Sequence, residues 1–142
     1  MDQFPNFEKR GGLLIVIVQD VETKEVLTHG FVNRAALWMT LREHQLWLWS
    51  TSRRKMWCKG ESSGNRMEVR SIKTDCDGDA LLVGVKVLGN GEACHLGRRF
   101  CFDQLVSQSM VADRLIFSDV TGTIVEPAFQ EPEGEVEDGS DR

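Results

Sequence analysis

The longest uninterrupted apolar stretch in this 142-residue chain is Leu13–Val18, only six residues long. Such a run is far too short to cross a bilayer, and its β-branched residues favour a fully buried strand over a helix. The polar segment 20–24 is typical of a turn, so a strand returning over residues 26–32 would complete a β-hairpin. No charged-then-apolar signal sequence opens the chain. We therefore expect a cytoplasmic protein without a membrane segment.

The rest of the chain predicts one helix among several short strands. Asn33 is a suitable N-cap, and the helix formers that follow it predict a helix over residues 34–43. Strands are predicted at 46–49, 56–59, 67–74 and 80–88, with weaker signals at 114–117 and 123–125. The predicted fold class is therefore α+β: a strand-dominated single domain with one principal helix and a mixed, folded, pseudo-barrel-like sheet.

Acidic residues are concentrated at the end of the chain. The formal net charge is −5, but residues 126–142 hold seven acids and one base, which leaves 15 acids and 16 bases in residues 1–125. We expect a loose N-terminal arm over 1–12, a domain over 13–125 and an acidic, disordered tail over 126–142. The negative total argues against nucleic acid as a partner.

The cysteines suggest either a metal site or simple packing. Without a secretion signal the thiols are expected to stay reduced. Cys94 and Cys101 lie seven residues apart, with Cys76 eighteen residues upstream of Cys94. Three such thiolates can hold zinc and leave a fourth position for water, although the spacing alone favours inert buried cysteines. His95, beside Cys94, is a candidate general base, with a metal ligand or a satisfied polar residue as alternatives.

Three carboxylates stand at alternate positions in Asp75, Asp77 and Asp79. In an extended segment they would share one face while Cys76 points to the other. Clustered carboxylates favour a hard cation such as magnesium. A solvated acidic turn is an equally well supported interpretation. A calcium loop is disfavoured because Lys86 stands at its twelfth position, where that loop needs an acid.

A third cluster combines basic, hydroxyl, glycine and tryptophan residues in the segments 49–53 and 57–64. Basic side chains, hydroxyls and backbone amides can hold phosphates, and tryptophans can stack on a base. By itself, the cluster is better explained as a surface loop anchored by two core aromatic residues.

Taken together, the three clusters resemble one enzyme family. The motifs are Trp49-Ser50-x-Ser-Arg53, Trp57-x-Lys59-Gly60-Glu61-x-Ser63-Gly64, Asp75-Cys76-Asp77-x-Asp79-Ala80-Leu81 and Ala93-Cys94-His95-x-Gly97-x-Arg99-x-Cys101-Phe102. In this order and spacing they resemble the phosphoribosyl-AMP cyclohydrolases of histidine biosynthesis. The resemblance implies that water adds at C6 of the adenine ring of 1-(5-phosphoribosyl)-AMP and that the N1–C6 bond is cleaved, the third step of the pathway.

The resemblance also implies cofactors, site residues and an oligomeric state. It implies zinc on Cys76, Cys94 and Cys101, magnesium on Asp75, Asp77 and Asp79, and a homodimer with active sites at the subunit interface. For this reaction His95 is the candidate for proton transfer, and the substrate-binding candidates are Arg53, Lys59, Glu61, Ser63 and Arg99. If Cys76 and the carboxylates face opposite ways, the zinc and magnesium of one site come from different chains.

The sequence departs from the family pattern in several places. The His or Tyr that usually precedes the Trp-Ser pair is replaced by hydrophobic residues around Trp47 and Leu48. Asn65 and Met67 stand where the family usually has His and Gln, Leu96 replaces a Thr, and Phe100 replaces a Ser. These changes suggest the loss of polar groups on the substrate side. The alternative to the cyclohydrolase is therefore a divergent metal-binding paralogue that acts on a related nucleotide or lacks catalysis.

Overall fold

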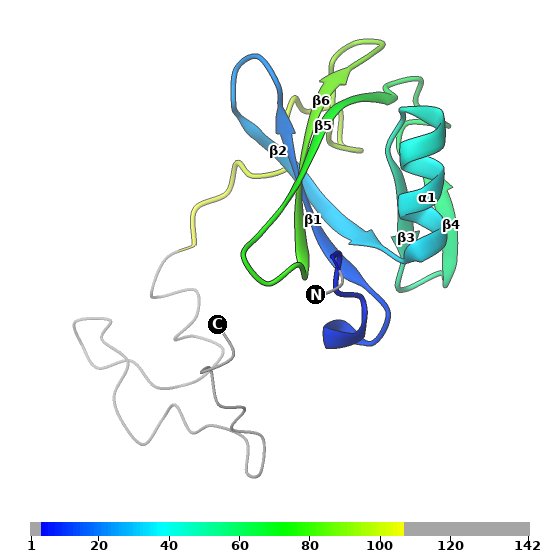
Figure 1. The fold of residues 1–142 in the computed structure, drawn as a ribbon. Helices are drawn as coiled ribbons and strands as arrows, with labels where there is room; N and C mark the ends of the chain where they lie inside the picture. The colour runs from blue at the N-terminus through cyan, green and yellow to red at the C-terminus, as the bar shows by residue number, and fades with distance from the viewer. Residues whose placement is uncertain (1–3, 107–142) are drawn as a thin grey trace, which may run out of the picture. The chain divides into compact units, whose positions relative to one another are not determined.

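The computed structural model describes residues 4–106 of the chain, and those up to Phe102 belong to one compact unit. The elements are the 3-10 turn η1 (Glu8–Arg10), β1 (Leu14–Asp20), β2 (Val26–Val32), α1 (Arg34–Glu43), β3 (Trp47–Ser50), β4 (Lys55–Cys58), β5 (Met67–Thr74) and β6 (Ala80–Val87) (Figure 1). The strands predicted at 114–117 and 123–125, and the predicted tail at 126–142, lie outside the described residues.

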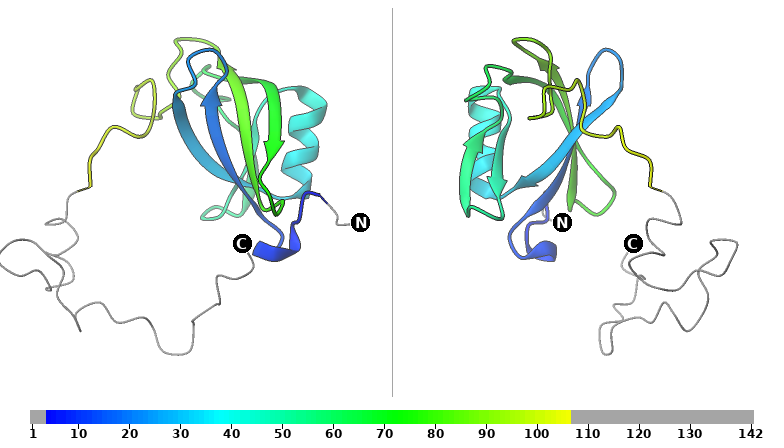
Figure 2. Two further views of the ribbon diagram at one scale, coloured as in Figure 1. Left: turned by 60° about the vertical axis from the view of Figure 1, so that its left-hand side comes forward. Right: turned by 180° about the vertical axis from the view of Figure 1, so that it is seen from behind.

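The main sheet has four strands in the order β2-β1-β6-β5. β1 pairs antiparallel with β2, as the predicted hairpin requires, and parallel with β6, which in turn pairs antiparallel with β5. The predicted mixed sheet is therefore confirmed, and over the described residues it is open rather than a closed barrel. β3 and β4 form a separate two-stranded sheet, which lies together with α1 on one side of the main sheet (Figure 2).

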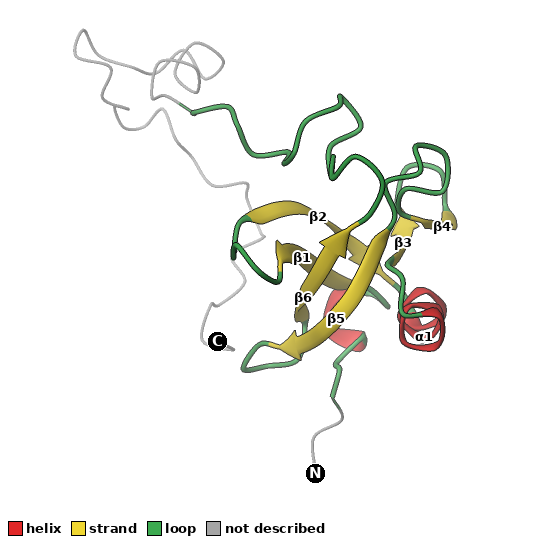
Figure 3. Cartoon of the chain, turned by 90° about the horizontal axis from the view of Figure 1, so that it is seen from above, coloured by secondary structure: helices red, strands yellow, loops and turns green. Residues whose placement is uncertain are grey.

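The core lies between the main sheet and this second layer, and α1 packs beside β3 (Figure 3). Leu14, Val16 and Val18 of β1 are fully buried, but Ile17 between them is exposed. The prediction of a strand buried on both faces is therefore wrong. Only one face of the sheet is covered here, so alternate side chains of β1 point to solvent.

The helix has the predicted bounds and the predicted N-cap. The backbone N–H of Ala36 donates to Asn33 Oδ1 at 2.8 Å, as expected for a capping asparagine. Thr40 joins the helix to β3, because its hydroxyl accepts a hydrogen bond from the backbone N–H of Trp47 at 2.9 Å. Over residues 4–106, no helix is long and apolar enough to span a bilayer.

The N-terminal arm was predicted to be loose, yet its described part is packed against the domain. Phe7 is only 4% exposed and joins the core. The backbone N–H of Asn6 donates to the carbonyl of Gly78 at 2.8 Å, and Arg10 forms a 3.0 Å ion pair with Asp79. The prediction failed because the partners of the arm are almost 70 residues away in the sequence.

Candidate functional site

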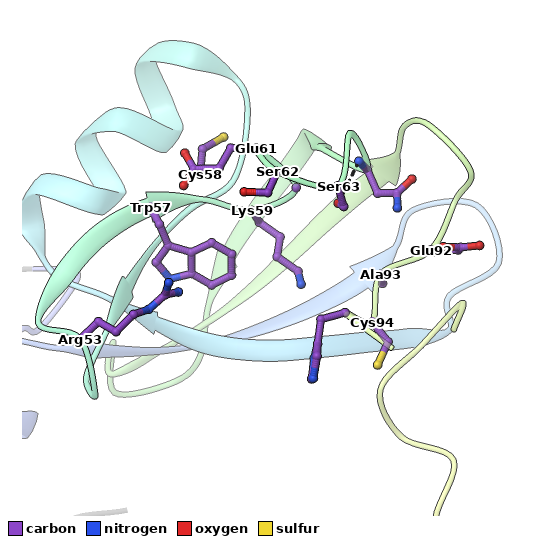
Figure 4. Close-up of a pocket in the computed structure, with 13 residues that line it drawn as sticks. Arg53, Trp57, Cys58, Lys59, Glu61, Ser62, Ser63, Glu92, Ala93 and Cys94 are labelled. Atoms are coloured by element: carbon purple, nitrogen blue, oxygen red, sulfur yellow. Dashed lines mark hydrogen bonds between the residues drawn. The ribbon is translucent and has the colours of Figure 1, made fainter. Parts of the chain in front are cut away.

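A pocket of about 380 Å³ opens between the loop after β4 and the segment after β6 (Figure 4). The first wall is the Trp57–Ser63 stretch together with Arg53, and the second wall is residues 92–95. Six of the predicted site residues line this pocket: Arg53, Lys59, Glu61, Ser63, Cys94 and His95. The structure thus brings together the phosphate-type loop and the Cys-His pair, which are more than thirty residues apart in the sequence.

The loop of the first wall needs its glycine at position 60. Gly60 has a φ of +85°, and a Cβ there would collide with the carbonyl of Asn65. The backbone N–H of Gly64 donates to the carbonyl of Gly60 at 2.8 Å and closes the loop. A side chain at position 60 would therefore force this wall of the pocket to change shape.

Asn65 ties the two walls together. Its Oδ1 accepts the backbone N–H of Asn90 at 2.7 Å, and its side chain is almost fully buried. A second hydrogen bond joins the same two segments, because the backbone N–H of Leu88 donates to the carbonyl of Arg66 at 2.7 Å. Asn65 therefore fixes the position of the turn that leads into residues 92–95.

Four of the departures from the family pattern can now be placed. Asn65 lines the pocket, but its carboxamide oxygen serves a structural hydrogen bond. Met67 is fully buried in the hydrophobic core, so its interpretation as a lost substrate-side group is wrong. Leu96 is exposed and Phe100 packs against the core.

Trp57 lies between two cations in the first wall. The Arg53 guanidinium carbon is 5.8 Å from the centre of the indole ring, and the Lys59 ammonium is 5.5 Å from it. Figure 4 shows the Lys59 side chain reaching into the space between Trp57 and Cys94. An aromatic face beside two positive charges suits a planar base that carries phosphate.

The second wall carries Cys94 and His95 on a tight turn. The N–H of Gly97 donates to the carbonyl of Cys94, and the N–H of Cys94 donates to the carbonyl of Arg98, both at 3.0 Å. This turn folds the chain back so that Cys101 lies beside Cys94. The Cys101 thiol donates to Thr28 Oγ1 at 3.2 Å. Burial raises the pKa of the Cys101 thiol, and the neighbouring Cys94 raises it further.

Cys76 is not part of this cluster. It is exposed in the β5–β6 turn, before β6 begins, whereas Cys94 and Cys101 follow β6 in the sequence. Figure 1 shows the β5–β6 turn at one end of β6 and the segment that follows β6 at the other. The backbone N–H of Cys101 donates to the carbonyl of Leu27, which lies at the end of the sheet where β1 ends. A strand rises about 3.3 Å per residue, so the separation along β6 is on the order of 20 Å. Zinc–sulfur bonds are about 2.3 Å long, so one chain does not assemble all three cysteines.

The three aspartates converge as predicted, but for a different reason. One oxygen of each of Asp75, Asp77 and Asp79 lies within 4.8 Å of the others. The segment was predicted to be extended, and it is instead a turn in which Gly78 has a φ of +75°. Asp75 Oδ1 accepts the backbone N–H of Asp79 at 3.1 Å and that of Ala80 at 3.2 Å. The turn, rather than strand alternation, brings the carboxylates together.

Cations from the N-terminal arm neutralise this acidic turn. Lys9 is bonded to Asp77 and lies 3.7 Å from Asp79, which also pairs with Arg10 at 3.0 Å. The Lys9 ammonium holds the pKa of Asp77 well below its usual range, whereas burial raises the pKa of Asp79. The oxygen donors suit a hard cation such as magnesium, but Lys9 and Arg10 would compete with it.

Arg99 does not line the pocket, although it was predicted to bind substrate. Its guanidinium bonds to Glu25 at 2.9 Å and lies 3.6 Å from Asp20. The backbone N–H of Thr23 donates to Asp20 and, more than Arg99 does, lowers the pKa of that carboxyl. These contacts fasten the segment after Gly97 to the β1–β2 turn.

Seven lining residues were not among the predicted site residues: Trp57, Cys58, Gly60, Ser62, Asn65, Glu92 and Ala93. Ser62 lay inside a motif that pointed to phosphate binding, so its position could have been predicted. No local spacing marks Glu92 or Asn65, because each reaches the pocket through the meeting of two distant loops.

The fold and the site together define a class: a small α+β enzyme whose polar pocket joins a glycine- and hydroxyl-bearing loop to a Cys-His turn. The family model of phosphoribosyl-AMP cyclohydrolase matches residues 28–103, which contain every lining residue of the pocket. The chain belongs to the phosphoribosyl-AMP cyclohydrolase family, and it is therefore a hydrolase.

Relatives from distant organisms agree with this assignment. The phosphoribosyl-AMP cyclohydrolase of Syntrophotalea carbinolica is 53% identical over 97 residues, covering 68% of this chain and 77% of the relative. That of Nitrosopumilus maritimus is 50% identical, covering 68% and 88%. The histidine biosynthesis bifunctional protein HisIE of Bacillus subtilis is 42% identical over 124 residues, covering 87% of this chain and 58% of the relative.

Proposed function

We propose that this protein opens the adenine ring of 1-(5-phosphoribosyl)-AMP by hydrolysis of the N1–C6 bond in histidine biosynthesis. The observation that carries the proposal is the pocket itself. It presents Arg53, Lys59 and Trp57 on one wall and Cys94 and His95 on the other. A nucleotide with its base on the indole face would hold its purine near the Cys-His turn.

Each wall has a distinct task in this reaction. Arg53 and Lys59 supply positive charge for phosphate oxygens. Ser63 Oγ already accepts the backbone N–H of Asn65 at 3.2 Å, so its own proton is directed elsewhere and can be donated to the substrate. Glu61 can accept a hydroxyl proton from a ribose. His95 moves the proton between the attacking water and the ring nitrogen that leaves.

We propose that Cys94 and Cys101 hold zinc together with Cys76 of the partner subunit. When bound, zinc supplies a Lewis acid that lowers the pKa of a water towards neutrality. The Cys94 and Cys101 thiols lie side by side, so they can bind the same ion once deprotonated. The acidic turn is the proposed magnesium site, where the ion would displace Lys9 and Arg10 from Asp77 and Asp79.

The position of Cys76 supports a homodimer with shared active sites. A single chain leaves Cys76 at the opposite end of β6 from the other two cysteines. A twofold axis can bring the turn of one copy to the pocket of the other, and can do so twice. Each dimer would then contain two complete sites.

Mixing two inactive variants tests the shared site. Cys76→Ala and Cys94→Ala are each expected to lose zinc and activity. In a mixture allowed to exchange subunits, half of the dimers are mixed and each regains one intact site, so about a quarter of wild-type activity should return. If mixing restores nothing, or if the enzyme is active as a strict monomer, the shared site is wrong.

The reaction itself is tested with the nucleotide. Phosphoribosyl-AMP is supplied with zinc and magnesium, and the ring-opened product is followed by its ultraviolet absorbance. Folded, zinc-loaded protein should turn the substrate over, and Cys94→Ala should not. A folded, zinc-loaded wild type without turnover would exclude the proposed reaction and favour the divergent paralogue.

A further inference from the structure

We propose that a second, smaller pocket beside the first binds one phosphate monoester of the substrate. This inference rests on the proposed function, because it assigns a place to one end of the proposed nucleotide. The smaller pocket has a volume of about 220 Å³ and lies at the β3–β4 turn. Its lining residues are His29, Gly30, Phe31, Leu48, Trp49, Ser50, Thr51, Ser52, Arg53 and Trp57.

The smaller pocket adjoins the larger one, because two residues line both. Arg53 and Trp57 line both. The Arg53 guanidinium carbon lies over the Trp57 ring, 5.8 Å from its centre. A ligand that rests on Trp57 can therefore extend into either pocket, and Arg53 can reach an anion in either.

The chemistry of the smaller pocket suits an anion. Its floor at the β3–β4 turn carries three consecutive hydroxyl residues followed by Arg53, and none of its lining residues within the described chain is acidic. The larger pocket, in contrast, contains the carboxylates of Glu61 and Glu92. Residues 44–60 include four Lys or Arg and no Asp or Glu. A phosphate dianion is therefore better accommodated at the turn.

The turn is already held in shape without the ligand. The backbone N–H of Arg53 donates to Ser50 Oγ at 3.1 Å, and that of Arg54 donates to the carbonyl of Ser50 at 2.7 Å. Ser50 thus maintains the turn, while Thr51 and Ser52 are exposed on it. The Thr51 hydroxyl can donate to a phosphate oxygen. The Ser52 Oγ lies 3.4 Å from Ser50 Oγ, and turning the Ser52 hydroxyl to a phosphate would leave the bonds from the N–H groups of Arg53 and Arg54 to Ser50 intact.

The substrate has two ends to place. 1-(5-Phosphoribosyl)-AMP carries one phosphate monoester on each of two riboses, attached at different positions of the purine. The two riboses direct their phosphates away from one another, so one compact site cannot hold both. The volumes of the two pockets together fall within the roughly 300–1,000 Å³ of small-molecule sites. The purine and one phosphoribosyl group fit the larger pocket, and the other phosphate fits the smaller one.

The test introduces a charge at Ser52 and compares it with a neutral residue of the same size. AMP and ribose 5-phosphate represent the two ends of the substrate, and their dissociation constants are measured by calorimetry on the full chain. Ser52→Asp should weaken one or both probes by about tenfold or more, because like charges repel strongly at hydrogen-bond distance. Ser52→Asn should change them by less than about threefold. Because AMP also contains a ribose 5-phosphate group, a response of either probe supports a phosphate subsite at the turn.

Three results would overturn the proposal: no binding of either probe to the wild type, no effect of Ser52→Asp, or equal effects of Ser52→Asp and Ser52→Asn. Thermal unfolding of both variants verifies that the exposed substitution leaves the fold intact. The proposed function can fail separately. Probe binding that responds to Ser52→Asp without turnover would refute the reaction alone, whereas turnover with an unchanged KM in Ser52→Asp would refute the phosphate subsite alone.

Discussion

Replacing Asn65 with alanine removes a side-chain hydrogen bond that connects the segments carrying the two pocket walls. The lost acceptor is Oδ1, which lies 2.7 Å from the backbone nitrogen of Asn90. A buried donor left without a partner costs about 1–3 kcal/mol. Asn90 is exposed, so water can partly replace the acceptor and the lower half of that range applies. We expect the free energy of unfolding to fall by about 1–2 kcal/mol.

Thermal unfolding followed by circular dichroism measures this loss. For a domain of this size, 1 kcal/mol shifts Tm by about 4–8 °C, so a loss of about 1–2 kcal/mol should lower the Tm of Asn65→Ala by about 4–16 °C. Asn90→Ala is the matched control, because it keeps the backbone donor and removes only an exposed side chain. Its Tm should change little.

Histidine offers a rescue at the same position. The Nδ1 of histidine is as many bonds from Cβ as the Oδ1 of asparagine, so Asn65→His can present an acceptor to the same N–H. It should retain most of the stability that Asn65→Ala loses. If Asn65→Ala leaves Tm unchanged, or if Asn90→Ala is equally damaging, the argument that Asn65 connects the walls is wrong.

Three further substitutions test other contacts. Asn33→Ala should cost about 1 kcal/mol in urea unfolding because α1 loses its cap, and Asn33→Asp should retain it. Met67→Ala should cost about 2–5 kcal/mol and Met67→Leu less than about 1.5 kcal/mol, with turnover retained in Met67→Leu; a selective loss of turnover would show that Met67 contacts substrate. Asp20 has a lowered pKa in the folded state, chiefly through the N–H of Thr23. Its charge therefore contributes stability above about pH 4, and this contribution disappears as the pH falls through the folded pKa. Asp20→Asn should be less stable than the wild type at pH 7, and the difference should shrink as the pH falls below about 4; a constant difference would contradict this linkage.

The sequence by itself determined the local elements. The helix over residues 34–43 and its asparagine cap depend on contacts three or four residues apart, and the strands depend on short apolar periods. Local spacing carries this information directly. The motifs were also sufficient to predict six of the residues that line the pocket, because their residue types and order resemble those of one family.

Only the tertiary structure decided which of these residues meet. The parallel pairing of β1 with β6 joins segments about 65 residues apart, and no local pattern specifies that choice. The same holds for Lys9 beside Asp77, for Arg99 at the β1–β2 turn and for Asn65 between the walls. Each is a polar group whose partner is selected by the packing of distant segments. The sequence thus determines the chemical groups that are available, while packing determines which of them share a site and which are used to hold the fold.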